Sequence, residues 1–171
     1  IERPGLPSLP VAWIGRAEAA REGALPPRCL PVLQLPGLPG LLPWGRVSAQ
    51  AGRAAADCVV WAAQAALRGE VDGIVTAPLH KESLHAAGVQ YPGHTELLQA
   101  EAALHAGVPL INMPVRMMLA NDELRTVLVS IHMALRDALE AVTCDNVLQT
   151  LRIAHAALLP SLGRATRMAV A

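Results

Sequence analysis

The fold class is indicated most clearly by one stretch of the chain, Asp72-Gly73-Ile74-Val75-Thr76-Ala77-Pro78-Leu79-His80-Lys81-Glu82. Its apolar centre, followed by Thr-Ala-Pro, predicts a short buried strand over 72–77, and the next residues predict a short helix over 80–87 closed by Gly88. Small apolar residues at helical spacing precede the strand from Ser48, a good N-cap residue, up to Gly69. A strand between two helices is typical of helices that cover a sheet, so we expect an α/β fold.

The alternation of helices and strands continues toward the end of the chain. A helix is predicted over 95–106, closed by Gly107, and two strands over 115–120 and 124–131. Because the two strands are close enough to form a hairpin, we expect the helices to pack on a mixed sheet. A last helix begins at Thr143 or Asp145 and runs to about 159, and a strand begins at 167–171.

The beginning of the chain is unusually rich in proline. Nine of the fourteen prolines fall within the first 43 residues, where we expect one short helix over 11–21, one strand over 31–35 and a turn over 36–40. We therefore divide a single incomplete α/β unit into a proline-rich connector region, 1–47, and a motif-bearing core, 48–171. The chain starts at Ile1 and stops within a predicted strand, so we expect a fragment of a longer protein.

Composition and charge exclude several classes of partner. The 171 residues carry fourteen basic and fourteen acidic side chains, and this zero net charge removes the usual electrostatic case for nucleic acid or an anionic membrane. No run approaches the roughly 20 apolar residues that a membrane helix needs. Three cysteines without a Cys-x-x-Cys pair fit a reducing compartment, so we expect a cytoplasmic protein.

The pair His94-Thr95 follows a Pro-Gly turn and is expected at the start of a helix. Free backbone N–H groups and the positive end of the helix dipole favour an anion there, and the imidazole and the hydroxyl can each donate a hydrogen bond. The pair is therefore a candidate for binding a phosphate or a carboxylate. The alternative is that Thr95 caps the helix, with Glu96 in its first turn and an incidental histidine.

Two further positions are candidates for chemistry. Lys81 is the only lysine beside thirteen arginines and follows the end of the predicted strand; the alternative is that it pairs with Glu82 or with solvent. His132 ends the most apolar strand and is a candidate metal ligand that Asp137 could orient; the alternative is a satisfied histidine near the core. One histidine does not make a metal site. The usual glycine-rich nucleotide motifs are absent, so a dinucleotide would have to bind by other means.

Five motifs in this order resemble the 4-hydroxythreonine-4-phosphate dehydrogenase family of vitamin B6 biosynthesis. They are Asp72–Glu82, Tyr91–Glu96, Met117–Ala120, Leu124–His132 and Leu135–Asp137, and the resemblance is strong from about Ser48 to Thr143. The resemblance implies a fold like that of isocitrate and isopropylmalate dehydrogenases, and a homodimer with its site at the interface.

The resemblance also implies a reaction. The family uses NAD or NADP to oxidise the secondary alcohol of 4-phosphohydroxy-L-threonine, after which the product loses carbon dioxide. A divalent metal (zinc, magnesium or cobalt), held by three histidines, polarises the alcohol and then the ketone. Carried over by motif, His94 and Thr95 would contact this small phosphorylated substrate, and His132 would be one metal ligand. Lys81 and Asp137 match frequent family positions without an assigned step.

The chain also departs from the family pattern. The family's opening segment has no counterpart, and the chain ends before the expected Asn-Pro-His-x-Gly-Glu segment, so two of the three metal histidines are missing. We therefore expect these 171 residues alone not to turn over substrate. Alternatives are a paralogue acting on a threonate phosphate or an aromatic cis-dihydrodiol, a non-catalytic remnant that folds or dimerises, and a module that binds phosphate without redox chemistry.

Overall fold

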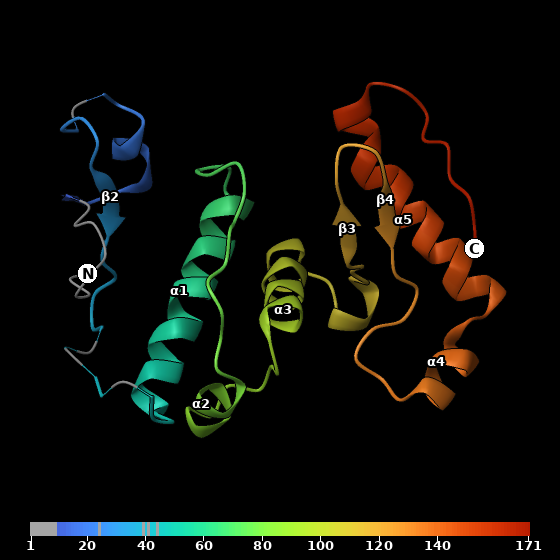
Figure 1. Cartoon of the computed structure of the whole chain (residues 1–171), viewed down its shortest axis with the longest axis horizontal. Helices are drawn as coiled ribbons and strands as arrows, with labels where there is room; N and C mark the ends of the chain where they lie inside the picture. Colours follow the sequence, from blue (N-terminus) through green and yellow to red (C-terminus); the bar gives the residue numbers. More distant parts are fainter. Residues whose placement is uncertain (1–9, 24, 39, 41, 44) are drawn as a thin grey trace. The chain divides into compact units, whose positions relative to one another are not determined.

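The computed structural model describes residues 10–23, 25–38, 40, 42–43 and 45–171. The chain divides into two compact units, one up to Met113 and one from Pro114, and each is described by itself (Figure 1). Within the described ranges no helix is both long and apolar enough to cross a membrane.

The first unit opens with a small parallel sheet. Strand β1 (Val11–Ile14) pairs with β2 (Leu30–Leu33), and the 3-10 helix η1 (Ala17–Ala20) lies in the connection between them. The predicted helix over 11–21 is therefore wrong: β-branched and aromatic residues at its start favour an extended strand once β2 offers a partner. The predicted strand over 31–35 is confirmed as β2. A turn forms at 36–37, while Pro39 of the predicted turn lies outside the described residues.

Three helices follow, and their predicted ends are confirmed by their caps. Helix α1 spans Ala49–Leu67, and the Ser48 hydroxyl accepts a hydrogen bond from the Ala51 amide at 3.2 Å. Helix α2 (Lys81–Ala86) is followed by Gly88 at φ +72°, and α3 (His94–Ala106) by Gly107 at φ +66°. Glycine reaches this left-handed conformation without steric cost, which is why these residues end helices.

The core of the first unit lies where α1 meets α2 and α3; in Figure 1, α2 lies at the foot of α1. Four buried side chains form its centre, and partly buried ones such as Leu79 and Tyr91 pack around them; the four are Ala56, Val59, Leu84 and Leu97. Three of the five buried residues of α1 are alanines (Ala56, Ala63 and Ala65), and their small side chains let the helices approach closely. The short 3-10 helix η2 (Leu110–Asn112) packs on α3 and completes the unit.

The predicted buried strand over 72–77 is wrong. Residues 73–80 form no helix, turn or strand and pair with no strand in the described chain, and the Val75 side chain is 102% exposed. The apolar run gives the segment its extended preference, but a strand also needs a neighbour to accept its backbone hydrogen bonds. Neither of the described sheets supplies that neighbour.

The second unit contains a hairpin and two helices. Strands β3 (Met118–Ala120) and β4 (Arg125–Val127) pair antiparallel, as predicted, although they are shorter than predicted. Helix α5 (Cys144–Leu162) begins after Thr143, whose hydroxyl accepts from the Asn146 amide, and its prediction is also confirmed. Helix α4 (Leu135–Ala141) was not predicted. No side chain caps its start, so the sequence lacks that local signal, and its apolar residues are mostly exposed.

In the second unit, the Arg116 guanidinium connects the hairpin to α5 by hydrogen bonds. Arg116, just before β3, donates to Thr150 Oγ1 at 2.8 Å, to Asn146 Oδ1 at 2.7 Å and to Gln149 Oε1 at 2.7 Å. All three acceptors lie on α5, so this side chain holds the helix against the hairpin. The strand predicted over 167–171 is wrong, since no strand forms there. Instead the tail is anchored by Thr166, whose Oγ1 lies 2.6 Å from His155 Nδ1.

The α/β class is confirmed at this coarse level. In place of one mixed sheet, the strands of the described ranges form two separate two-stranded sheets, one parallel and one antiparallel.

Candidate active site

The His94-Thr95 pair occupies the first two positions of α3. Gly93 is the N-cap residue, in extended conformation, and no side chain caps the helix. The alternative in which Thr95 caps α3 is therefore wrong. Because Gly93 has no side chain, the amides of the first turn are free of a protein cap, and the positive end of the 13-residue helix dipole is left for another acceptor.

The imidazole of His94 shows an unusual lack of partners. Its Nε2 atom is buried, yet it makes no hydrogen bond within the described chain. Buried polar atoms are almost always paired, because losing their hydrogen bonds to water without replacement costs free energy. An orphaned nitrogen at an uncapped helix start is what a ligand-binding residue shows in the absence of its ligand. This geometry fits an acceptor atom, such as a phosphate, carboxylate or hydroxyl oxygen.

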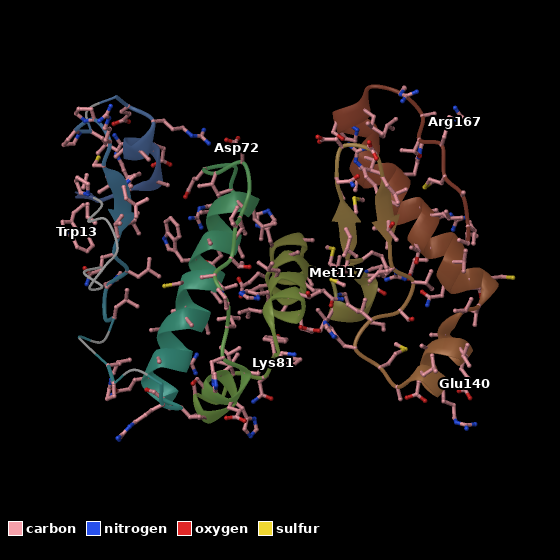
Figure 2. The ribbon with its side chains drawn as sticks, in the orientation of Figure 1. Trp13, Asp72, Lys81, Met117, Glu140 and Arg167 are labelled. Carbon is pink, nitrogen blue, oxygen red and sulfur yellow. The ribbon has the colours of Figure 1, made fainter. Side chains whose placement is uncertain are left out.

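Lys81 lies in the same unit, as the first residue of α2, and its side chain is exposed (Figure 2). No ion pair with Glu82 forms, so the alternative that Lys81 pairs with its neighbour is wrong for the described structure. Its ammonium is available to a ligand or to solvent.

His132 and Asp137 both belong to the second unit. His132 follows β4, is exposed, and has φ +53°, a left-handed conformation that few residues other than glycine adopt. It is therefore not the satisfied histidine near a core that was the alternative. Such backbone outliers concentrate at functional sites, where the surrounding structure holds them. Asp137 is exposed in the first turn of α4, and no described hydrogen bond joins its carboxylate to the imidazole.

The described residues do not by themselves form a metal centre. No group of three or more His, Cys, Asp or Glu side chains gathers with metal-binding geometry in the part of the chain that the structure covers. The His132 imidazole is exposed and can supply one ligand, whereas protein zinc sites use three or four. The described residues alone therefore do not fit a catalytic metal.

Sequence reasoning missed a second polar cluster in the first unit. His80 Nδ1 accepts from the Ser83 amide at 3.3 Å and lies 3.2 Å from Ser83 Oγ, and that hydroxyl accepts from the Ser48 amide at 3.2 Å. The available signal was a histidine directly before a helix, which can cap it as serine or asparagine does. The cluster fixes the start of α2 against the start of α1.

Comparison with known proteins identifies the relatives of this chain. The family model of "Pyridoxal phosphate biosynthetic protein PdxA" matches residues 8–171. A 4-hydroxythreonine-4-phosphate dehydrogenase from Beijerinckia indica is 44% identical over 142 residues, which are 83% of this chain and 40% of the relative. The D-threonate 4-phosphate dehydrogenase of Salmonella typhimurium is 41% identical over 138 residues, covering 80% of this chain and 40% of that protein.

Solved structures give the same result. A 4-hydroxythreonine-4-phosphate dehydrogenase from Klebsiella pneumoniae matches with a TM-score of 0.73 and 31% identity, over 92% of this chain and 44% of that one. One from Burkholderia phymatum matches with a TM-score of 0.69 and 36% identity, over 88% and 42%. The chain thus spans about 40% of the length of the curated relatives it matches. The family resemblance predicted from the motifs is confirmed: this chain belongs to the pyridoxal phosphate biosynthetic protein PdxA family.

Proposed function

We propose that this chain supplies part of the active site of a dehydrogenase of pyridoxal phosphate biosynthesis, with a fold like that of isocitrate and isopropylmalate dehydrogenases. The reaction is the oxidation of the secondary alcohol of 4-phosphohydroxy-L-threonine by NAD or NADP, followed by decarboxylation. Family membership and the names of the relatives support this assignment. The observation that carries the local argument is the buried, unpartnered Nε2 of His94 at the uncapped start of α3.

Each candidate residue has a distinct role in this proposal. His94 donates or accepts a hydrogen bond through Nε2 to an oxygen of the substrate, and Thr95 donates from its hydroxyl next to it. Such contacts orient the reacting carbon, and orientation is a large part of catalysis when the substrate would otherwise be mobile. Lys81 and Asp137 are charged groups at positions that match the family, and neither has an assigned step.

His132 is proposed to supply one ligand to a divalent metal, with zinc, magnesium or cobalt as candidates, and the other ligands come from outside the described residues. A bound metal of this kind supplies Lewis-acid polarisation of an alcohol or ketone oxygen. The exposed imidazole of His132 and its left-handed backbone are the observations that support the assignment. We also propose a homodimer as the functional form.

A chimera tests this function. Residues 48–143 of this chain would replace the matching segment of the Beijerinckia relative, and NADH or NADPH formation would be followed with 4-phosphohydroxy-L-threonine. We expect turnover by the chimera. In that background, His94→Ala and Thr95→Val should each lower kcat/KM by about 10- to 100-fold, the loss expected for one or two hydrogen bonds to a charged group. Replacing His132 with asparagine should remove activity together with bound metal.

The matched control is His105→Asn. His105 is an exposed histidine in the last turn of the same helix and lies in no motif, so its variant should keep full activity. A chimera that folds but stays inactive would count against the proposal. Equal losses in the His94 and His105 variants would do the same.

D-threonate 4-phosphate should be tested as a second substrate in the same assay. The Salmonella relative named for D-threonate 4-phosphate is 41% identical, close to the 44% of the Beijerinckia relative. Both substrates combine a phosphate with a secondary alcohol, so the residues proposed here suit either of them. Higher kcat/KM on D-threonate 4-phosphate would assign this chain to that branch of the family, and an aromatic cis-dihydrodiol is the remaining alternative.

A further inference from the structure

A surface pocket of about 400 Å³ lies between the beginning of α1 and the beginning of α2. Its lining combines two cationic or donor side chains, Arg46 and His80, with an apolar floor that includes Leu79 and Leu84. Neither His94 nor Thr95 lines it. This volume falls in the range of small-molecule sites and far exceeds the roughly 30 Å³ of a water molecule.

The charge of the pocket favours an anion. None of its described lining residues is acidic, and Arg46 makes no ion pair with any described residue. Ser48 caps α1 beside the pocket, and Ala51 of the first helical turn lines it, so the positive end of this 19-residue helix also contributes.

The hydrogen-bond network holds one side of the His80 ring, its Nδ1 atom, against Ser83. In the neutral ring, Nδ1 accepts from the Ser83 amide at 3.3 Å, so the proton is carried by Nε2. Ser83 is 5% exposed and is itself held by the Ser48 amide, so the imidazole is anchored on one side. The described hydrogen bonds of the ring involve Nδ1 and none involves Nε2, and His80 is an exposed residue that lines the pocket.

We propose that this pocket binds the phosphate group of a small phosphate ester. The Arg46 guanidinium and the His80 Nε2–H contact the phosphate oxygens, and the apolar floor takes the organic part of the ester. The contacts of Nδ1 with Ser83 hold the His80 ring without a ligand, so binding does not have to order it first. This site does not depend on the proposed dehydrogenase function, since binding is measured on the 171-residue chain without turnover.

The test is calorimetric titration of the chain with propyl phosphate and with inorganic phosphate, alongside amide NMR spectra. We expect saturable binding, with shifts at Ser83 and Gly45, and several-fold tighter binding of propyl phosphate because its alkyl group contacts the apolar floor. Equal or tighter binding of inorganic phosphate would contradict the ester assignment. Absence of saturable binding by either probe in the millimolar range would overturn the proposal.

Two variants test the contacts and leave the fold intact. His80→Ser keeps a good helix cap but removes the ring, and Arg46→Gln removes the charge; each should weaken binding by about 10-fold or more. His85→Ser, on the same helix and outside the pocket lining, should bind like the parent chain. Circular dichroism checks that all three remain helical. If His80→Ser and His85→Ser weaken binding equally, the assignment of His80 is wrong.

Discussion

At Gly52 the backbone of α1 touches the backbone of α2. A Cβ atom built at this position would lie 1.9 Å from the carbonyl oxygen of Ser83 and 2.3 Å from its carbonyl carbon. Real Cβ atoms do not approach backbone so closely, so the two helices can meet only if this residue has no side chain. The same approach lets Ser83 Oγ reach the Ser48 amide.

We predict that Gly52→Ala destabilises the chain by about 2 kcal/mol or more, because the added methyl forces α1 and α2 apart. Alanine normally stabilises a helix relative to glycine, so the sign of the effect separates the close contact from helix propensity. Urea unfolding measures it. The control is Gly73→Ala, whose Cβ meets nothing within 4 Å and which should change the free energy of unfolding by less than about 0.5 kcal/mol. A stable Gly52→Ala variant would refute the contact.

At the scale of elements, an exposed ion pair between Arg68 and Glu70 lies directly after the end of α1. Arg68 Nε and Nη2 donate to the two Glu70 carboxylate oxygens at 2.6 and 3.0 Å. The hydrogen bonds from Arg68 are the main reason that the pKa of Glu70 is lowered, and its positive charge adds to the effect. Because the folded pKa lies below the unfolded one, this contribution to stability is present above the unfolded pKa and is lost as pH falls through the folded value.

We predict that the Glu70 carboxylate titrates below 4.5, the ordinary value, in an NMR pH titration of the folded chain. Arg68→Ala should return its midpoint toward that value. The expected change in overall stability is small, because the pair is exposed to solvent and is screened by salt. A midpoint that does not move in the Arg68→Ala variant would show that the carboxylate is stabilised by something else.

The elements also show what the sequence could and could not predict. Helices α1, α2, α3 and α5 were predictable because their caps are local: Ser48, Thr143 and the glycines act within one turn. Strands need partners from elsewhere in the chain, which local sequence does not reveal, so the sequence predicts a helix over 11–21 and a buried strand over 72–77, and both predictions are wrong. The His94-Thr95 position was predictable from Pro-Gly, but the orphaned Nε2 depends on tertiary burial and was not.

At the scale of the whole chain, the candidate residues are divided between the two compact units. His94, Thr95 and Lys81 belong to the first and His132 and Asp137 to the second. One exposed imidazole cannot hold a catalytic metal by itself, and the described residues contain no group of three or more potential metal ligands.

We therefore predict that the purified 171-residue chain forms no detectable NADH or NADPH from 4-phosphohydroxy-L-threonine, with zinc, magnesium or cobalt present. It should also fail to retain zinc through gel filtration. Both measurements need the same preparation, and circular dichroism shows whether it is folded. Turnover by the folded chain would mean that its own residues complete a site, against the absence of a metal-binding group among the described residues.

The unpaired segment 73–79 has a practical consequence for work with this chain. Its backbone amides make no hydrogen bond in the described structure, and Val75 is fully exposed beside Ile74. An open, apolar edge of this kind is a template for intermolecular β-pairing. Concentrated solutions of the chain should therefore aggregate, and a charged residue in place of Val75 should slow this aggregation.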